Sequence, residues 1–430
     1  MSEHNILDLV AGYRQANTRK QQLEAQGSDL SELKYSVAHT VQRLHPKRLS
    51  LQVSAIVDET PSTRTLRLIP IPNRDETQRR PEDDRRKSLW DSTASTARAD
   101  DKVSFLFGMG ITPAVGPLPP FQAGQYVNVY VNIDGIATAR PYAISSSPGQ
   151  RRHYDITVKR ARDGFVSGYL LDRVNVGQIL QTSGPMGTFH HNPLFHGREL
   201  VFLAGGSGIV PARSMLLDMI ERQLPWQFDV IYGNSFENDV IFQQELRELA
   251  QAHPNIRLTE LVSRPTAGYR GRSGHVSADL LRQVLSGDLS RKMYYLCGPT
   301  PFNNNALAQL QQLGVPRRRI RVEANGAPKN PACLAQWPAG VMPQQEVTVT
   351  VQGKGSFRAR SDEPLLNSLE RNGYGAENAC RSGECSLCRV KLVAGKVFNP
   401  PEARLRQSDR DFGWIHSCVA YPLQDIEILL

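Results

Sequence analysis

The sequence has few cysteines and no long apolar segment. Only six of its 430 residues are cysteines, too few for the disulfide-rich scaffolds of small secreted domains. No apolar run reaches the roughly 18 residues that a membrane span needs. The start, Met1 to Asn5, lacks the basic segment and apolar core of a secretion signal. These absences favour a cytoplasmic protein with reduced cysteines.

The sequence also lacks a recognisable nucleic-acid-binding motif. Its formal net charge of +9 indicates an anionic partner, but it contains no helix-turn-helix, zinc finger or RNA-binding signature. Phosphate-bearing cofactors therefore explain the charge better than a nucleic acid. The length leaves room for about three domains.

Four of the cysteines form a pattern near the C-terminus. Cys380, Cys385 and Cys388 have the spacing C-x4-C-x2-C, and Cys418 follows further on. This spacing is that of plant-type 2Fe-2S clusters, and soft thiolates suit iron. Zinc sites usually show two short C-x2-4-C pairs, and only Cys385 and Cys388 are spaced in that way. The pattern favours a 2Fe-2S cluster over a zinc site or disulfides.

Two segments differ from the rest of the chain. Residues 1–48 carry apolar side chains at helical spacing, which predicts a helical extension. We favour helices packed on the main body over a docking element for a partner protein. Residues from 72 to about 120 begin with mixed charge and proline, which predicts a mobile surface insertion.

From Glu199 onward, short apolar strands alternate with helices, which indicates a parallel sheet with crossover helices. The strand 200–204 is followed by the loop Gly205, Gly206, Ser207 and Gly208, and we expect a helix from Ala212 to Glu221. Glycines let phosphate oxygens approach the backbone, and the start of a helix attracts negative charge. The context of strand, loop and helix predicts a site for nucleotide phosphates.

Upstream segments at 121–130, 140–148, 158–160, 164–170 and 184–189 resemble, in their order and spacing, the flavin domain of the ferredoxin-NADP reductase family. The resemblance implies an antiparallel six-stranded barrel over residues 49–195 that contains the insertion. It assigns Arg140 to a flavin phosphate and Tyr142 to the flavin ring and ribityl chain. The other implied cofactor contacts are Pro141, Ala143, Lys159 and the phosphate loop Gly164, Val166 and Ser167.

One position departs from the family pattern. The family usually follows the tyrosine with serine or threonine, whose hydroxyl reaches flavin N5, and here that residue is Ala143. We expect Ser145 or a backbone N–H to take this role. The resemblance implies FAD, with FMN as the alternative.

The same family carries a G-G-T-G-I-x-P loop and a C-G-P turn at places that match residues 205–211 and the turn Cys297, Gly298 and Pro299. The resemblance implies an NAD(P)-binding domain over 196–325, with Cys297 beside the nicotinamide. The implied catalytic residues are Tyr142, Ser145 and Cys297. Ser263 and Arg264 lie where NADPH-using members hold the 2′-phosphate, so NADPH is favoured and NADH stays open.

The C-terminal part resembles plant-type ferredoxins. Residues 326–345, rich in proline and glycine, are expected to form a linker, and Cys333 within it has no ligand role. Expected strands at 346–351, 355–360, 389–393 and 425–429, with a helix at 364–371, resemble the β-grasp fold. This domain, 346–430, contains all four predicted ligands of the cluster.

Together the three resemblances match the layout of reductases of the phthalate dioxygenase reductase type. They imply an NAD(P)H-dependent iron-sulfur flavoprotein oxidoreductase. Electrons would pass from NAD(P)H through the flavin to the cluster, and on to a separate terminal protein such as an oxygenase or other metalloprotein. Two alternatives are a self-sufficient flavoenzyme that reduces a quinone, oxygen or a ferric chelate, and a redox or iron sensor.

Overall fold

The computed structural model describes residues 46–71, 112–113, 117–324, 326–334, 336–401 and 403–430, together with positions 18, 21, 22 and 25. The chain separates into two units, Met1–Lys47 and Arg48–Leu430. In the first unit, the described positions 18, 21, 22 and 25 are helical, and residues 46 and 47 are not. The rest of the predicted helical extension, and most of the predicted insertion, lie outside the described residues.

The first sheet is an antiparallel barrel, which confirms the expected fold of the flavin domain. Its strands follow the order β5-β4-β7-β1-β2-β6, and β3 pairs parallel to β1. A bridge between Ile144 and Ile156 links the ends of this order, beside strands β5 and β6. Along the first half of β1, every second residue is apolar and lies in the barrel core. The elements are β1 Leu49–Thr60, β2 Thr63–Pro70, β3 Thr112–Pro113, β4 Tyr126–Ile133, β5 Ile136–Ala143, β6 Tyr154–Lys159, helix α4 Phe165–Asp172 and β7 Ile179–Thr182.

The end of the predicted insertion belongs to this barrel. Leu118 is fully buried in the barrel core, and its N–H donates to the carbonyl of Arg151 at 2.8 Å. The carbonyl of Pro119 accepts a hydrogen bond from the hydroxyl of Tyr154. Leu118 and Pro119 are buried while Pro117 and Pro120 are exposed, so the last residues of the predicted insertion are anchored in the barrel.

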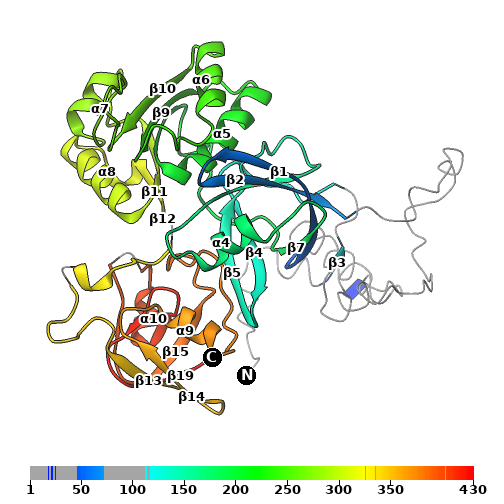
Figure 1. Ribbon diagram of the computed structural model, residues 1–430, viewed down its shortest axis with the longest axis vertical. Coiled ribbons are helices and arrows are strands. Elements are labelled where there is room, and N and C mark those ends of the chain that lie inside the picture. Colours follow the sequence, from blue (N-terminus) through cyan, green and yellow to red (C-terminus); the bar gives the residue numbers. More distant parts are fainter. Residues whose placement is uncertain are drawn as a thin grey trace, which may run out of the picture. The chain divides into compact units, whose positions relative to one another are not determined.

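The second sheet is parallel, with strand order β10-β9-β8-β11-β12 (Figure 1). Apolar residues of α5 and α6 pack with alternate residues of β8 and β9 on one face. Residues of α7 and α8 pack with the intervening positions on the other face, as expected for a parallel sheet covered on both sides. The elements are β8 Glu199–Gly205, α5 Ile209–Glu221, β9 Gln227–Asn234, α6 Gln243–Ala252, β10 Ile256–Val262, α7 Ala278–Val284, β11 Met293–Gly298, α8 Thr300–Gln312 and β12 Ile320–Ala324.

The helix after the glycine loop begins earlier than predicted. Gly206–Gly208 form a 3-10 turn that leads directly into α5 at Ile209 rather than at Ala212. Pro211 lies in the first turn of this helix, where its missing N–H costs no hydrogen bond. The glycines therefore form the beginning of the helix, which places their backbone at its positive end.

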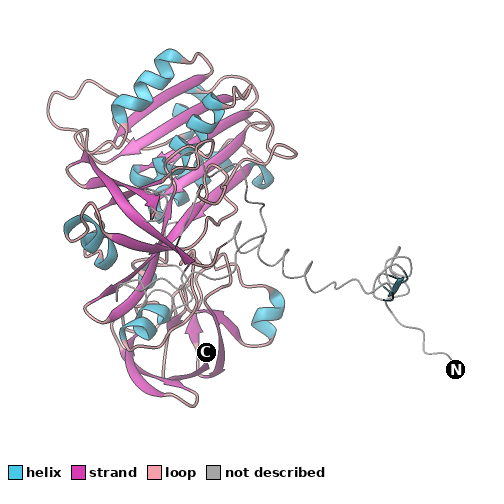
Figure 2. Ribbon diagram, turned by 90° about the vertical axis from the view of Figure 1, so that its right-hand side faces the viewer, coloured by secondary structure: helices cyan, strands magenta, loops and turns pink. Residues whose placement is uncertain are grey.

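The third sheet is mixed and has the strand order β14-β13-β19-β15-β17. Leu365 and Leu369 of helix α9 lie in the same core as alternate residues of β13 and β19. Trp337 of the predicted linker packs against Phe398 and Tyr421. The elements of this region are β13 Glu346–Val351, β14 Gly355–Arg360, α9 Leu365–Arg371, β15 Arg389–Ala394, β16 Val397–Phe398, α10 Gln407–Asp411, β17 Trp414–His416, β18 Tyr421–Pro422 and β19 Ile426–Leu429. Strands β16 and β18 pair with each other in a small separate sheet. Figure 2 shows the strands in magenta.

Among the residues that the structure describes, no helix is both long and apolar enough to cross a membrane.

Replacing Gly208 tests how closely the glycine loop packs against β11. A Cβ atom at this position would lie 1.9 Å from the carbonyl oxygen of Cys297, so Gly208→Ala must push α5 away from β11. We expect a loss of stability of about 1–3 kcal/mol, as for overpacked cores. Thermal unfolding followed by circular dichroism measures this loss as a lower midpoint.

The matched control is Gly168→Ala in α4. A Cβ atom there meets no atom within 4 Å, and alanine favours a helix over glycine by up to about 1 kcal/mol. The midpoint should stay unchanged or rise slightly. Equal unfolding temperatures for the two variants would contradict the close contact between Gly208 and the carbonyl of Cys297.

Candidate functional site

The four predicted cluster cysteines lie as two pairs. The sulfur atoms of Cys388 and Cys418 are 3.1 Å apart, and the thiol of Cys385 hydrogen-bonds to Cys380. Within the described ranges, no group of three or more histidine, cysteine or acidic residues converges on a single ion. Two pairs suit a 2Fe-2S cluster, in which each iron takes two of the four thiolates. A zinc site would need four donors around one ion.

The loop between the first cysteines is shaped to hold such a cluster. Arg381, Gly383 and Ser386 have positive φ angles of 54°, 78° and 60°. The backbone N–H groups of Ser382 and Cys385 each lie 3.4 Å from the sulfur of Cys380. Hydrogen bonds from Cys385 and then Ser382 lower the pKa of Cys380, although burial opposes them. This favours the thiolate, which is the form that binds metal.

Arg140 on β5 lies in a region with excess positive charge. Its Nη1 donates to Thr138 Oγ1 at 2.6 Å and lies 3.8 Å from Glu370 Oε2, while Arg381 pairs with the same carboxylate. Burial, followed by the charge of Arg381, lowers the pKa of Arg140 to about 10, so it stays charged at neutral pH. Two cations share one carboxylate, and a flavin phosphate would supply the missing negative charge.

The residues that follow Arg140 in the chain differ in how deeply they are buried. Pro141, Tyr142 and Ala143 continue β5 and are half-buried, and burial raises the pKa of Tyr142, which keeps its phenol neutral. Ser145 is fully buried. Its hydroxyl donates to the Asp155 carbonyl at 3.1 Å and accepts from Thr157 Oγ1 at 3.0 Å. The expected flavin contact of Ser145 through its hydroxyl therefore has no free donor, because the barrel uses it.

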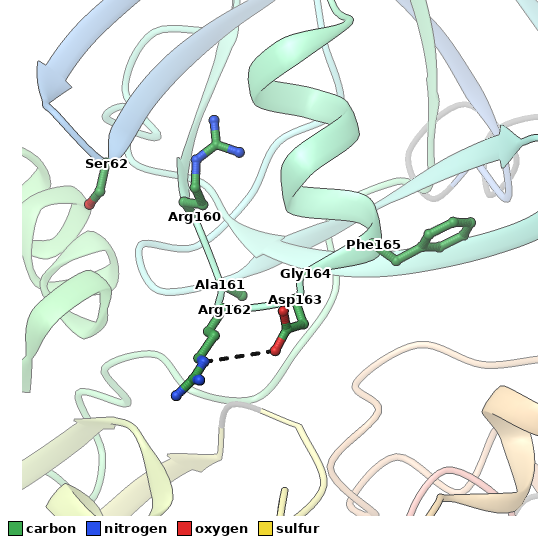
Figure 3. Close-up of a pocket in the computed structure, with 7 residues that line it drawn as sticks. All are labelled: Ser62, Arg160, Ala161, Arg162, Asp163, Gly164 and Phe165. Carbon is green, nitrogen blue, oxygen red and sulfur yellow. Dashed lines mark ion pairs between the residues drawn. The ribbon is translucent and has the colours of Figure 1, made fainter.

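The predicted phosphate loop lies at the start of α4. A pocket of about 610 Å³ opens there, lined by Ser62 and residues 160–165 (Figure 3). The first turn of a helix leaves N–H groups free for an anion. Val166 and Ser167 are buried, and Ser167 Oγ accepts the N–H of Ala161 at 3.1 Å. Ser167 therefore shapes the loop through this hydrogen bond.

Lys159 is engaged in an ion pair between two sheets. Its Nζ lies 2.8 Å from Asp239 Oδ2, in the segment between β9 and α6. Thr60 and Ser62 also donate to Asp239, at 2.5 and 2.7 Å. Lys159, which we predicted to contact a cofactor, thus links the barrel to the parallel sheet.

The predicted nucleotide residues gather at the C-terminal edge of the parallel sheet, where such sheets bind nucleotides. Gly205 to Gly208 follow β8, and Gly206 has a φ of 54°. Asn234 ends β9, and its side chain is buried.

The other nucleotide residues lie at neighbouring strand ends. Cys297 and Gly298 end β11 and are buried, and Pro299 caps α8. Burial raises the pKa of Cys297, so its thiol is neutral. Ser263 and Arg264 follow β10, and their N–H groups donate to the carbonyls of Asn234 and Ser235 at 2.9 Å.

Sequence reasoning missed Glu323 at the end of β12. This half-buried carboxyl has its pKa raised to about 8 by burial and then by the charges of Glu384 and Cys380. A second pocket of about 400 Å³ is lined by Glu323, Glu384, Arg321, Arg404 and residues 188–189, 317–318, 320 and 322. The nucleotide sheet and the cluster loop meet here. No local pattern in the sequence marks Glu323, because its surroundings come from residues distant in the chain.

Three family models match the chain in order. An oxidoreductase FAD-binding domain matches residues 118–191, an oxidoreductase NAD-binding domain matches 202–307, and a 2Fe-2S iron-sulfur cluster binding domain matches 349–423. With the three sheets and the paired cysteines, they define an NAD(P)H-dependent iron-sulfur flavoprotein oxidoreductase. The predicted cofactors FAD, NAD(P)H and a 2Fe-2S cluster are confirmed at this level.

Similar proteins identify the family. The glycine betaine monooxygenase reductase subunit of Pseudomonas aeruginosa (strain UCBPP-PA14) is 30% identical over 355 residues, which cover 80% of this chain and 92% of that protein. The ferredoxin reductase component of 3-ketosteroid-9-alpha-monooxygenase from Mycobacterium tuberculosis (strain CDC 1551 / Oshkosh) is 30% identical over 72% of this chain and 86% of that one. The chain belongs to this family of reductases with FAD-binding, NAD-binding and C-terminal 2Fe-2S domains.

A solved structure shares the fold. Phthalate dioxygenase reductase aligns with a TM-score of 0.58 and 19% identity, over 89% of this chain and 97% of that chain. The alignment spans all three sheets, which agrees with the predicted layout.

The cysteine assignment predicts different results for two exposed thiols, Cys385 and Cys333. Cys385→Ser should abolish the visible absorbance of the cluster and leave flavin in place, because a hard hydroxyl replaces one of four soft ligands. Cys333→Ser is the matched control and should retain both. Iron and flavin content per chain check this, and a Cys385→Ser protein with wild-type iron content and cluster absorbance would contradict the assignment.

Proposed function

We propose that this protein is the reductase component of an oxygenase system, which delivers electrons from NADPH to a separate oxygenase. The order of the FAD-binding, NAD-binding and 2Fe-2S domains carries the proposal. Two relatives that match most of the chain support it, since both are reductase components of monooxygenases. An oxygenase takes up electrons one at a time, and a C-terminal cluster domain suits that delivery.

The cofactors supply the redox chemistry: the flavin takes a hydride from the nicotinamide and releases electrons singly, and the cluster carries one electron at a time. The residues of the chain bind and orient these groups. We assign a flavin phosphate to Arg140 and the phosphate loop at Gly164, and the flavin ring to Tyr142. The neutral buried thiol of Cys297 limits water at the nicotinamide position. The cluster is assigned to Cys380, Cys385, Cys388 and Cys418.

Arg264 supports NADPH as the donor. Its guanidinium is exposed directly after β10 and makes no ion pair with any described residue. A 2′-phosphate is the group that distinguishes NADPH from NADH, and an arginine at this edge of the sheet suits it.

Replacing Arg264 should separate the two donors. Arg264→Ala removes a charge-assisted hydrogen bond, so KM for NADPH should rise roughly tenfold or more, while KM for NADH stays near its original value. Steady-state reduction of ferricyanide with each donor measures this. Equal changes for NADPH and NADH would count against a 2′-phosphate contact.

The electron route can be tested by removing the flavin. In the intact protein under anaerobic conditions, NADPH should bleach the flavin bands and then the cluster bands. In flavin-depleted protein, NADPH should leave the cluster oxidised, and added FAD should restore its reduction, because only the flavin accepts a hydride. Dithionite, which reduces the cluster directly, is the control for cluster integrity.

Two outcomes would reject the proposed function. If the purified protein contains no flavin, the central step is missing. If NADPH bleaches the flavin but never the cluster, the protein is instead a flavoenzyme that reduces its acceptor at the flavin.

A further inference from the structure

A buried ion pair lies directly beside the first cluster cysteine. Arg381 follows Cys380, and its guanidinium donates to both carboxylate oxygens of Glu370, on helix α9, at 2.7 and 3.0 Å. Both side chains are less than a tenth exposed. Asn367 and Asn378 accept further hydrogen bonds from the same guanidinium at 2.6 and 3.3 Å. Such a two-pronged pair holds the loop in one orientation.

The same pair reaches the flavin barrel. Arg381 Nη1 donates to the carbonyl of Ala139 at 3.2 Å, and Thr138 Oγ1 donates to Glu370 Oε2 at 2.9 Å. Both barrel residues lie on β5, the strand that carries Arg140. Arg140 in turn donates to Thr138 Oγ1 at 2.6 Å. One chain of hydrogen bonds therefore joins the residue next to a cluster ligand to the predicted flavin-phosphate arginine.

The other contacts near this junction are weaker. The side chain of Asn128 on β4 donates to the carbonyl of Asn378 at 3.4 Å, near the limit of a hydrogen bond. Breaking the Arg381–Glu370 pair would leave a buried charge without its partner, which is far more costly than losing a surface ion pair. The hydrogen bonds from Arg381 to Ala139 and from Thr138 to Glu370 are thus the shortest polar contacts described between β5 and this buried pair.

We propose that Arg381 and Glu370 are positioning residues, which lock the cluster loop onto β5 and thereby fix the separation of flavin and cluster. The inference rests on the proposed function, because it concerns electron passage between these two groups. Neither residue binds a cofactor itself. Their role is to hold Cys380 and Arg140 in one rigid arrangement.

The test measures the two reduction steps separately. In rapid-mixing experiments with NADPH, Arg381→Gln should slow cluster bleaching roughly tenfold or more, since small misplacements are costly, while flavin bleaching stays within about twofold of wild type. Arg381→Lys should recover part of the loss, because it keeps the charge but not the two-pronged geometry. Cluster and flavin content are measured for every variant.

A barrel-side variant keeps the test valid if Arg381→Gln loses its cluster. Thr138→Val removes the hydroxyl that donates to Glu370 and accepts from Arg140, without changing the cluster loop. In protein with wild-type flavin content, it should slow cluster bleaching in the same direction. Hydrogen exchange gives a readout independent of activity. Backbone amides of β5, residues 136–143, should exchange faster in both variants, because the contact that covers the strand is weakened.

The matched control is Arg371→Gln. Arg371 follows Glu370 on α9 and forms an equally two-pronged pair with Glu363, at 2.6 and 2.7 Å, but it is exposed and stays within the ferredoxin domain. It should change neither reduction step nor the exchange of β5. The inference is overturned if Arg381→Gln or Thr138→Val retains wild-type cluster bleaching and wild-type exchange at β5. Wild-type protein whose cluster is not reduced by NADPH would reject the proposed function instead.

Discussion

The buried carboxylate of Glu370 is the group on which the arrangement of the redox sites depends. It accepts two hydrogen bonds from Arg381 and one from Thr138, and Arg140 lies 3.8 Å away. Two cations and one anion leave this buried region positively charged, a state that an anionic flavin phosphate would relieve. Binding of the flavin and docking of the cluster loop therefore share one electrostatic centre. Through this centre, each would stabilise the other by linkage.

Charge also organises the second junction, between the nucleotide sheet and the cluster loop. Glu323 lies among Glu384, Arg321 and Arg404, and its carboxyl is largely protonated near neutral pH because its pKa is raised to about 8. A neutral carboxyl beside the thiolate ligands avoids repulsion between like charges. Lys159 and Asp239 form a third link, from the barrel to the parallel sheet. Polar bridges thus connect all three cofactor regions.

Sequence patterns predicted the elements that follow local rules. The cysteine spacing was sufficient to predict the 2Fe-2S domain. The strands around Leu200 and Val347 could be predicted from an apolar run and from alternation. What could not be predicted depended on contacts between distant residues. Ser145 carries a hydroxyl that suits a flavin, yet the barrel core uses it. Glu370 and Glu323 carry no local signal, because their importance comes from partners that are distant in sequence or from burial in the folded chain.

The most direct test of this account is a crystal structure of the protein with its flavin and cluster bound. The account predicts the flavin phosphate on Arg140 and the Arg381–Glu370 pair intact against β5, with two cysteine sulfurs on each iron. It would be contradicted by a structure in which Arg381 faces solvent and helix α9 lies away from Thr138, since no shared electrostatic centre would then join the two cofactors.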